Sequence, residues 1–232
     1  MPIIDIVISG SAKMTSVFNP TLFKGKLALI SGGATGICYE IAKQFLIHGA
    51  SVYIISRKIE NINKAVKSLA EETGNKTFGE ARAMTVLMID TVGTFLLSKY
   101  TAELSMKKSG VILNISANLH YSGTALQAHS GTAKAGVDAL TKHMAVEFGP
   151  RDIRVIGICP GPIQGTEGID RLNPKDVKTE QLLPLQRLGT KLDVANACLF
   201  SASSAASYVT GSIIMVDGGS TLTQPNFAFS SK

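Results

Sequence analysis

The sequence has few cysteines, no closely spaced histidines and no long apolar run. Its three cysteines, Cys38, Cys159 and Cys198, are far apart and form no C-x-x-C pair. This pattern excludes a disulfide framework and a zinc site of that type, and it favours a reducing compartment. The apolar run at residues 3–8 is interrupted by Asp5 and no basic segment precedes it. We therefore expect no metal site, no membrane span and no signal peptide.

The composition indicates a single globular domain. The chain of 232 residues is 45% hydrophobic and has a mean hydropathy of +0.21, which suffices for a sizeable core. We expect this domain to span residues 25–222, between an N-terminal extension (1–24) and a C-terminal tail (223–232). The net charge of +6 comes from dispersed basic residues. That distribution favours phosphorylated small molecules over nucleic acid as partners.

A short strand, a glycine-rich turn and a helix open the domain. The apolar run at residues 27–30 is followed by S-G-G-A-T-G-I-C at residues 31–38, where Cys38 stands in a position that usually holds a third glycine. Such a turn presents backbone N–H groups to a diphosphate. A turn without a ligand is the alternative interpretation. The predicted cofactor contacts in this turn are Gly32, Gly33, Thr35, Gly36 and Ile37.

A second buried strand, residues 51–56, ends beside Arg57. Sites for NAD usually place an acidic residue at this position, whereas a basic residue accommodates the 2′-phosphate of NADP. Arg57 therefore favours NADPH as the cofactor. A solvated surface arginine is the alternative.

A further stretch, residues 114–134, joins the end of an apolar strand to a polar loop and a helix. Lys134 lies in the first turns of this helix, one turn after Ser130. A lysine placed there could face a ligand held at the carboxyl end of the strand. An exposed helical lysine is the alternative.

These features resemble the short-chain dehydrogenase/reductase family, and within it the peroxisomal-type 2,4-dienoyl-CoA reductases. The resemblance covers about residues 23–226 and implies an α/β fold with a Rossmann-like, doubly wound parallel sheet. It rests on residues 31–37, I-D-T-V-G-T-F at 89–95, N-I-S-A at 114–117, A-K-A at 133–135, P-G-P-I at 160–163, G-T-E-G at 165–168, P-L-Q-R-L-G at 184–189 and V-D-G-G at 216–219.

The resemblance also implies a catalytic group. Most members use an Asn, Ser, Tyr and Lys tetrad, and the matching positions here are Asp90, Ala117, Ser130 and Lys134. An aliphatic hydroxyl is a far weaker acid than a phenol, so Ser130 cannot readily protonate a ketone. A conjugated thioester suits the site better, because its proton goes to carbon while charge collects on the thioester oxygen.

The candidate catalytic residues are therefore Asp90, Lys134 and Ser130. Asp90 with Lys134 resembles the pair of the peroxisomal-type enzymes, with Asp90 expected to be a buried acid and Lys134 to hold the nicotinamide ribose as well. A locally hydrogen-bonded surface aspartate is the alternative for Asp90. By the same resemblance, the contacts with the nicotinamide end of the cofactor are Pro160, Gly161, Ile163 and Thr166.

Two arginines are candidates for binding the substrate. The resemblance implies a fatty acyl-CoA, and Arg57 and Arg171 could meet its phosphates. A solvent-exposed arginine is the alternative for Arg171.

The match to the family has one interruption, between Gly74 and Met84. The family places a third strand, a crossover helix and a fourth strand here, which amounts to roughly 40 residues. We therefore expect a fold that lacks two strands and one helix, shortened near residues 75–83 and continued by a largely apolar helix over residues 80–109. Loss of the fourth strand opens the centre of the sheet.

The sequence thus predicts NADPH-dependent reduction of 2,4-dienoyl-CoA to 3-enoyl-CoA in the β-oxidation of unsaturated fatty acids. The alternatives are another short-chain reductase, acting on an enoyl-CoA or a carbonyl, and a shortened chain without activity. The helix at 130–148 carries Val137, Leu140, Met144 and Val146, so its outer face could pack against another copy, and the resemblance implies a homo-oligomer, either a tetramer or a dimer. The ending Ser231-Lys232 resembles an S-K-L address without its final leucine, so we expect a peroxisomal or otherwise cytoplasmic location.

Overall fold

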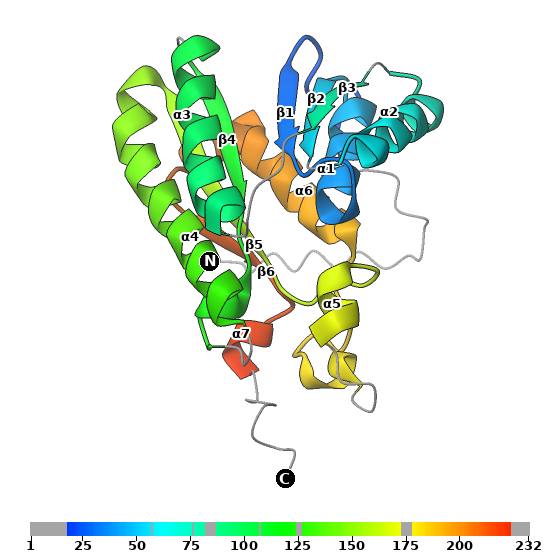
Figure 1. The fold of residues 1–232 in the computed structure, drawn as a ribbon. Coiled ribbons are helices and arrows are strands. Elements are labelled where there is room, and N and C mark those ends of the chain that lie inside the picture. The colour runs from blue at the N-terminus through cyan, green and yellow to red at the C-terminus, as the bar shows by residue number, and fades with distance from the viewer. Residues whose placement is uncertain are drawn as a thin grey trace, which may run out of the picture.

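The computed structural model describes residues 18–56, 58–75, 77–81, 87–106, 108–123, 127–172 and 178–223 (Figure 1). The strands in this part of the chain are β1 (Leu27–Ser31), β2 (Ser51–Ser56), β3 (Thr77–Ala81), β4 (Gly110–Ile115), β5 (Ile153–Pro160) and β6 (Ile213–Val216). The α-helices are α1 (Gly36–Ile47), α2 (Ile59–Thr73), α3 (Thr94–Leu104), α4 (Ala128–Phe148), α5 (Glu167–Leu172), α6 (Lys191–Ala202) and α7 (Ser220–Thr223). A π-helix, η1 (Met88–Gly93), precedes α3, and short 3-10 turns are η2 (Asn118–His120), η3 (Gly149–Arg151), η4 (Thr179–Leu182) and η5 (Ser204–Ala206).

The described strands form two separate three-stranded parallel sheets. The first has the order β1-β2-β3 and the second the order β4-β5-β6. Since the carboxyl ends of parallel strands share one edge, the turn after β1 and the loops after β4 and β5 open toward the ligand side expected of an α/β sheet. The expected Rossmann-like α/β architecture is confirmed, and its sheet is interrupted between β1 and β4.

One face of the first sheet is well packed. Along this face Ile30 pairs with Ile54, and Ile54 pairs with Gly79. Helices α1 and α2 cover it, and Ile54 and Ile62 are almost completely buried. Gly79 has no room for a side chain, because a Cβ there would lie 2.5 Å from Ile62 Cγ2 and 2.7 Å from Ile54 Cγ1.

The opposite face of the first sheet is uncovered in the described structure. Its central row consists of Leu29, Tyr53 and Phe78, which are paired across the three strands. Leu29 is 37% exposed and Phe78 is 57% exposed, while Leu27 at the start of β1 is 71% exposed. Parallel sheets normally have helices on both faces, so β1 has the exposure of an edge strand although the family places it at the centre.

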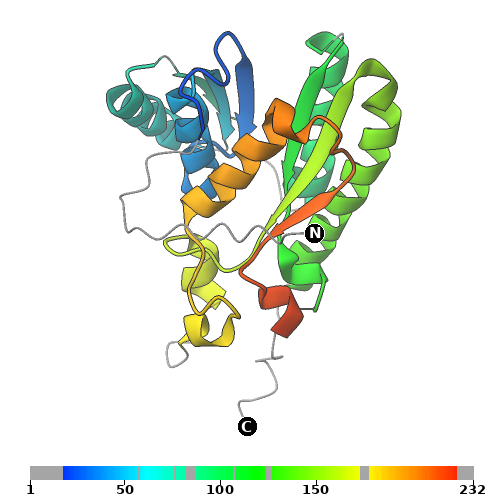
Figure 2. The ribbon, with the colours of Figure 1, turned by 180° about the vertical axis from the view of Figure 1, so that it is seen from behind.

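Helix α6 joins the two halves of the molecule. It packs on α1 of the first half and on the strands of the second half, and both views show it between them (Figures 1 and 2). Its buried residues Val194, Cys198 and Leu199 belong to one core cluster with Leu46 of α1 and Ile156 of β5. The break in the sheet therefore does not divide the hydrophobic core.

Three expectations from the sequence need correction. The sequence predicted that two strands are missing after Gly74, but one strand, β3, is present there and pairs in parallel with β2. The sequence did not reveal β3 because its residues, T-F-G-E-A, include types that are uncommon in strands. The helix expected over residues 80–109 does not include Glu80, which lies in β3, and its described part consists of Leu87, η1 and α3. Finally, Val137 and Met144 of α4 are 1% and 2% exposed and pack inside their own chain.

Candidate functional site

The glycine turn after β1 has the backbone geometry that its sequence predicts. Gly32 and Gly36 have φ values of +73° and +63°, a region that favours glycine. Gly33 is needed for a different reason, since a Cβ on it would lie 2.5 Å from Ile54 Cγ2. The turn is tied to the sheet by the Gly32 N–H, which donates to the Ile55 carbonyl at 2.6 Å.

The turn leads into the N-terminus of α1. Thr35 is the N-cap residue and its side chain makes no capping hydrogen bond, while Gly36 and Ile37 are the first residues of the helix. The first N–H groups of a helix have no partner within it and attract anions. The five predicted residues of this turn thus lie together at one helix N-terminus.

Lys134 lies at the carboxyl end of β4. Its Nζ donates to the Ile115 carbonyl at 3.0 Å and lies 3.4 Å from Asp90 Oδ2. The two side chains are 21% and 25% exposed, so a ligand can reach them. The ion pair joins η1, which carries Asp90, to α4.

Close packing of η1 on α4 positions this ion pair. The Thr91 hydroxyl donates to the Ala133 carbonyl at 3.0 Å. Gly136 admits Thr91, because a Cβ on that glycine would lie 2.7 Å from Thr91 Cγ2. A π-helix within a longer helical segment is frequent at functional sites.

Asp90 differs in its surroundings from the buried acid that we expected. Its carboxylate is a quarter exposed and faces the Lys134 ammonium, whereas the sequence placed it among apolar neighbours. The difference arises because its partner lies 44 positions further along the chain.

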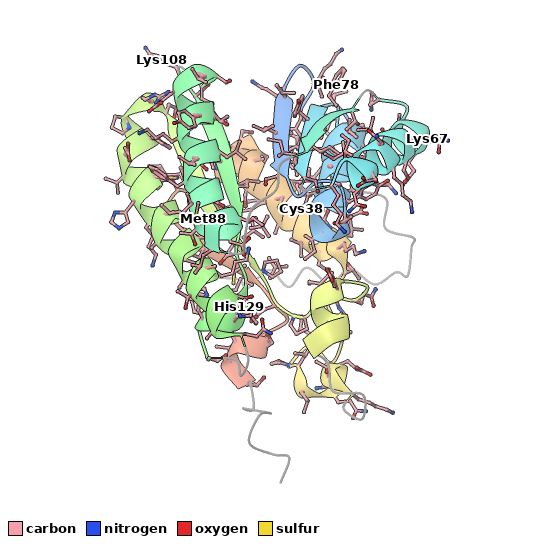
Figure 3. All side chains as sticks on the ribbon, in the orientation of Figure 1. Cys38, Lys67, Phe78, Met88, Lys108 and His129 are labelled. Carbon is pink, nitrogen blue, oxygen red and sulfur yellow. The ribbon has the colours of Figure 1, made fainter. Side chains whose placement is uncertain are left out.

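Cys38 connects the glycine turn with the ion pair. A Cβ on Gly32 would lie 3.7 Å from the Cys38 sulfur. Burial raises the pKa of the Cys38 thiol, the charge of Lys134 lowers it and the charge of Asp90 raises it. The Cys38 thiol therefore lies beside the glycine turn and is influenced by the charges of the ion pair in the other half of the molecule. Figure 3 labels Cys38 on α1 and Met88 on η1.

The site contains no phenol at the positions of the family tetrad. By the resemblance, Ala117 and Ser130 match the two hydroxyl positions, and Ser130 lies in the first turn of α4, one turn before Lys134. Tyr121 does not replace the missing acid, because its hydroxyl donates to Asp138 at 2.7 Å. Burial and the hydrogen bond to Asp138 raise the pKa of Tyr121 above its usual range.

The loop after β5 carries the remaining predicted cofactor contacts. Pro160 ends β5, and a Cβ on Gly161 would lie 2.6 Å from Asp217 Cβ. Ile163 is 2% exposed, and the Thr166 hydroxyl donates to its carbonyl at 2.7 Å. These contacts define the course of the loop beside the carboxyl end of β5.

Two predicted residues cannot be placed. Arg57 lies outside the described residues, and so does the side chain of Arg171, whose backbone belongs to α5.

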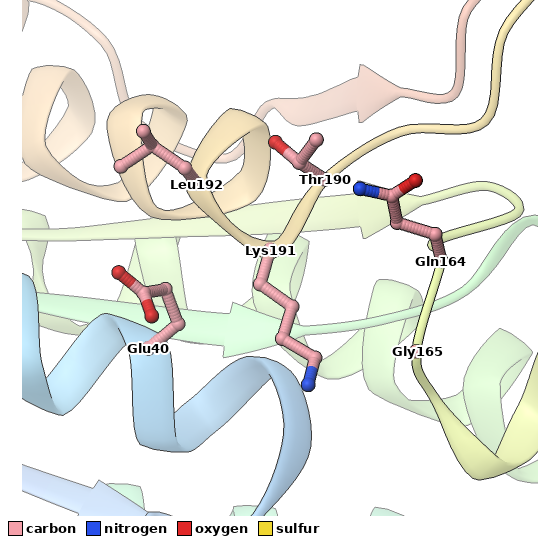
Figure 4. A pocket seen from close by; sticks show the side chains of 6 residues that line it. All are labelled: Glu40, Gln164, Gly165, Thr190, Lys191 and Leu192. Atoms are coloured by element: carbon pink, nitrogen blue, oxygen red, sulfur yellow. The ribbon is translucent and has the colours of Figure 1, made fainter. Parts of the chain in front are cut away.

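An open cavity of about 610 Å³ lies near the loop that follows β5 (Figure 4). It is bordered by α1, by the loop after β5 and by the start of α6, and it contains none of the predicted site residues. The residues that line it are Glu40, Gln164, Gly165, Thr190, Lys191 and Leu192.

In the described part of the chain, no helix has the length and apolarity to cross a membrane.

Comparisons with known proteins place this chain in a family. Residues 77–221 match the family described as enoyl-(acyl carrier protein) reductase, and residues 26–85 match that of short chain dehydrogenases. The peroxisomal 2,4-dienoyl-CoA reductase of Danio rerio is 39% identical, over 92% of this chain and 87% of the relative. This chain belongs to the short-chain dehydrogenase/reductase family.

Other relatives of this chain have names similar to that of the Danio rerio protein. The peroxisomal 2,4-dienoyl-CoA reductase of Arabidopsis thaliana is 35% identical over 91% of this chain and 90% of the relative. A Bacillus subtilis protein named as a probable 2,4-dienoyl-CoA reductase is 30% identical over 84% and 96%. The alignment with the Danio rerio protein extends over 262 positions, more than the 232 residues of this chain. The relatives therefore contain residues that this reductase-family chain lacks.

Solved structures agree with the family assignment. A citronellol catabolism dehydrogenase of Pseudomonas aeruginosa has a TM-score of 0.79 at 27% identity, with 89% of this chain and 99% of that chain covered. A 7α-hydroxysteroid dehydrogenase complexed with NADH has the same TM-score and identity, with 88% and 98% covered. Members of the family thus bind a nicotinamide dinucleotide on this fold.

Proposed function

We propose that this oxidoreductase uses NADPH to reduce 2,4-dienoyl-CoA thioesters to 3-enoyl-CoA. The observation that carries the proposal is the Asp90–Lys134 ion pair beside the glycine turn, in a site where Ala117 and Ser130 replace the usual donors. The names of the relatives, among them peroxisomal 2,4-dienoyl-CoA reductases that produce (3E)-enoyl-CoA, support the same substrate.

The residues present fit a dinucleotide cofactor. A Cβ placed on Gly36 meets nothing within 4 Å, so the approach to the helix N-terminus is open for a diphosphate. In the proposal Arg57 binds the 2′-phosphate and Lys134 the nicotinamide ribose, and NADPH when bound supplies a hydride. The other proposed contacts are Gly32, Gly33, Thr35, Gly36 and Ile37 for the diphosphate, and Pro160, Gly161, Ile163 and Thr166 for the nicotinamide end.

The chemistry needs a donor at the thioester oxygen and a proton for carbon. The Ser130 hydroxyl is suited to the first task, since hydrogen bonding to a developing oxyanion does not require proton transfer. Asp90 and Lys134 share the second task, because their ion pair holds a proton in a partly exposed position from which water can carry it. A ketone would need a phenol-like acid instead, so we expect little turnover of simple ketones.

We propose three further properties on the same basis. Arg57 and Arg171 bind the phosphates of CoA, whose anionic groups match the net charge of +6. Residues 25–222 form the reductase domain between an extension at 1–24 and a tail at 223–232. The protein is a peroxisomal homo-oligomer, as supported by the peroxisomal relatives and by the 80% exposure of Val146 on α4.

One observation favours a second candidate, a chain without activity. The sheet is interrupted between β1 and β4, and a displacement of about 1 Å in a reacting group can cost two orders of magnitude in rate. An enoyl-CoA or carbonyl reductase is the remaining alternative, and it needs an acid that Ser130 does not provide.

The test combines cofactor binding with turnover. We expect NADPH, more than NADH, to raise the melting temperature, and we expect NADPH consumption with 2,4-decadienoyl-CoA. Lys134→Met should lose both effects, whereas Lys142→Met, on the exposed side of the same helix, should keep them. Absence of a thermal shift with either cofactor would establish the inactive chain, and turnover of a simple ketone would favour the carbonyl reductase.

A further inference from the structure

Strand β1 has one unpaired edge. It pairs with β2 on one side, and in the described part of the chain no strand lies on its other side. The Gly32 N–H donates to the Ile55 carbonyl, and alternate residues of a strand direct their backbone groups to opposite sides. The N–H groups of Leu27, Leu29 and Ser31 therefore point toward the unpaired edge, which is a template for a further strand.

The hydrophobic core is incomplete along the same edge. On the packed face of the first sheet, Ile54 of β2 is 0% exposed, whereas Ala28 and Ile30 of β1 are only partly buried against the core cluster. At the β3 edge of this sheet the row is closed, because a Cβ on Gly79 would lie 2.5 Å from Ile62 Cγ2 of α2. An apolar strand beside β1 would extend the row and bury its last side chains further.

The sequence before Phe18 contains one segment with the composition of such a strand. Residues 3–8 are I-I-D-I-V-I, and five of the six are β-branched apolar residues, which favour strands. In a strand Ile4, Ile6 and Ile8 share one face and Asp5 lies on the other. With the isoleucines on the packed face, the carboxylate projects from the uncovered face into water, whereas the reverse register would bury it.

The linker to this segment starts close to β1. Phe18 is the first described residue, and its ring lies edge-on to that of His48, with 6.1 Å between the centroids. The His48 carbonyl accepts from the Phe23 N–H at 2.8 Å, shortly before β1 begins. Residues 9–17 can span about 30 Å, and a strand of six residues is about 20 Å long. Residues 3–8 can therefore reach the edge of β1 in either direction.

We propose that residues 3–8 form a strand that pairs with the unpaired edge of β1, with Ile4, Ile6 and Ile8 on the packed face. This strand supplies, from another part of the chain, a neighbour for β1 at the interruption of the sheet. The pairing engages the backbone of β1 and leaves the opposite face uncovered, so Leu27 remains exposed there. The proposal concerns the sheet and does not depend on the proposed activity.

The experiment measures amide hydrogen exchange by NMR on the full chain. The Leu29 amide should be protected although it points away from β2. Ile6→Asp puts a charge on the packed face, so we expect the protection of Leu29 to fall by about tenfold or more. Val7→Asp is the matched control, since it puts the same charge on the uncovered face and should leave the protection unchanged. The Ile30 amide points toward β2 and should stay protected in all three proteins.

A second measurement needs no variant. Nuclear Overhauser contacts from the Leu29 amide to residues 3–8 should be present in the wild type, and their absence would overturn the proposal. Exchange of this amide at the rate of a free peptide would do the same, and equal losses in Ile6→Asp and Val7→Asp would reject the assignment of the faces. Protection that rises with protein concentration would show that the strand comes from a second copy, which would overturn pairing within one chain.

Discussion

The uncovered face of the first sheet leads to a quantitative prediction about Leu27. A leucine in the first strand of an intact doubly wound sheet is buried on all sides, yet here Leu27 is 71% exposed. Full burial of a leucine side chain stabilises a protein by about 1.5 to 3 kcal/mol. Since less than a third of this residue is covered, we expect Leu27→Ala to lower the free energy of unfolding by about 1 kcal/mol or less.

The matched control is Leu46→Ala on α1. Leu46 is 0% exposed and lies in the core that joins both halves of the molecule. The same chemical change should therefore cost about 3 to 5 kcal/mol there, because a cavity remains in addition to the lost transfer free energy. The comparison keeps the residue type constant and varies only burial.

Equilibrium unfolding in urea provides the measurement. Both variants should show the m-value of the wild type, which verifies that the same surface is exposed on unfolding. A loss of more than about 2.5 kcal/mol for Leu27→Ala would place it among fully buried leucines. That result would refute the open sheet, because something must then cover β1 in solution.

Two more predictions follow from local geometry. Gly33→Ala forces a Cβ to within 2.5 Å of Ile54 Cγ2, so we expect about 1 to 3 kcal/mol of destabilisation in urea and weaker NADPH binding in a fluorescence titration. For α6, hydrogen bonding to Arg187 and to Thr190 lowers the pKa of Asp193 from 3.8 to about 2. Stability from this carboxylate is present above pH 3.8 and is lost as the pH falls through about 2. Asp193→Asn should remove this pH dependence and cost about 1 kcal/mol of capping at neutral pH, and an unchanged acid titration of stability would contradict the assignment.

The interrupted sheet shows how a short chain can keep a candidate site. The two groups of residues that the site needs lie in different halves, the glycine turn in the first and Lys134 in the second. Helix α6 holds the halves together through the shared core. Cys38, in the position where the family usually has a glycine, lies beside Gly32 of the turn, and the charges of Lys134 and Asp90 affect the pKa of its thiol.

The sequence by itself determined the local parts of this protein. The spacing of Gly32 and Gly36 predicted the glycine turn, because its conformation depends on residues a few positions apart, and the structure shows positive φ values at both glycines. The four-residue spacing of Ser130 and Lys134 predicted their common face on α4 for the same reason. The family motifs added the parallel α/β fold.

Only the tertiary structure decided which distant groups meet. It paired Asp90 with Lys134 across 44 positions of sequence, and it joined His120 to Asp138. It also formed β3 from residues with little strand preference, because pairing with β2 and packing on α2 outweigh local propensity. Burial, charge partners and the uncovered face of the first sheet depend on contacts between segments far apart in the chain, and these arise only when the chain folds.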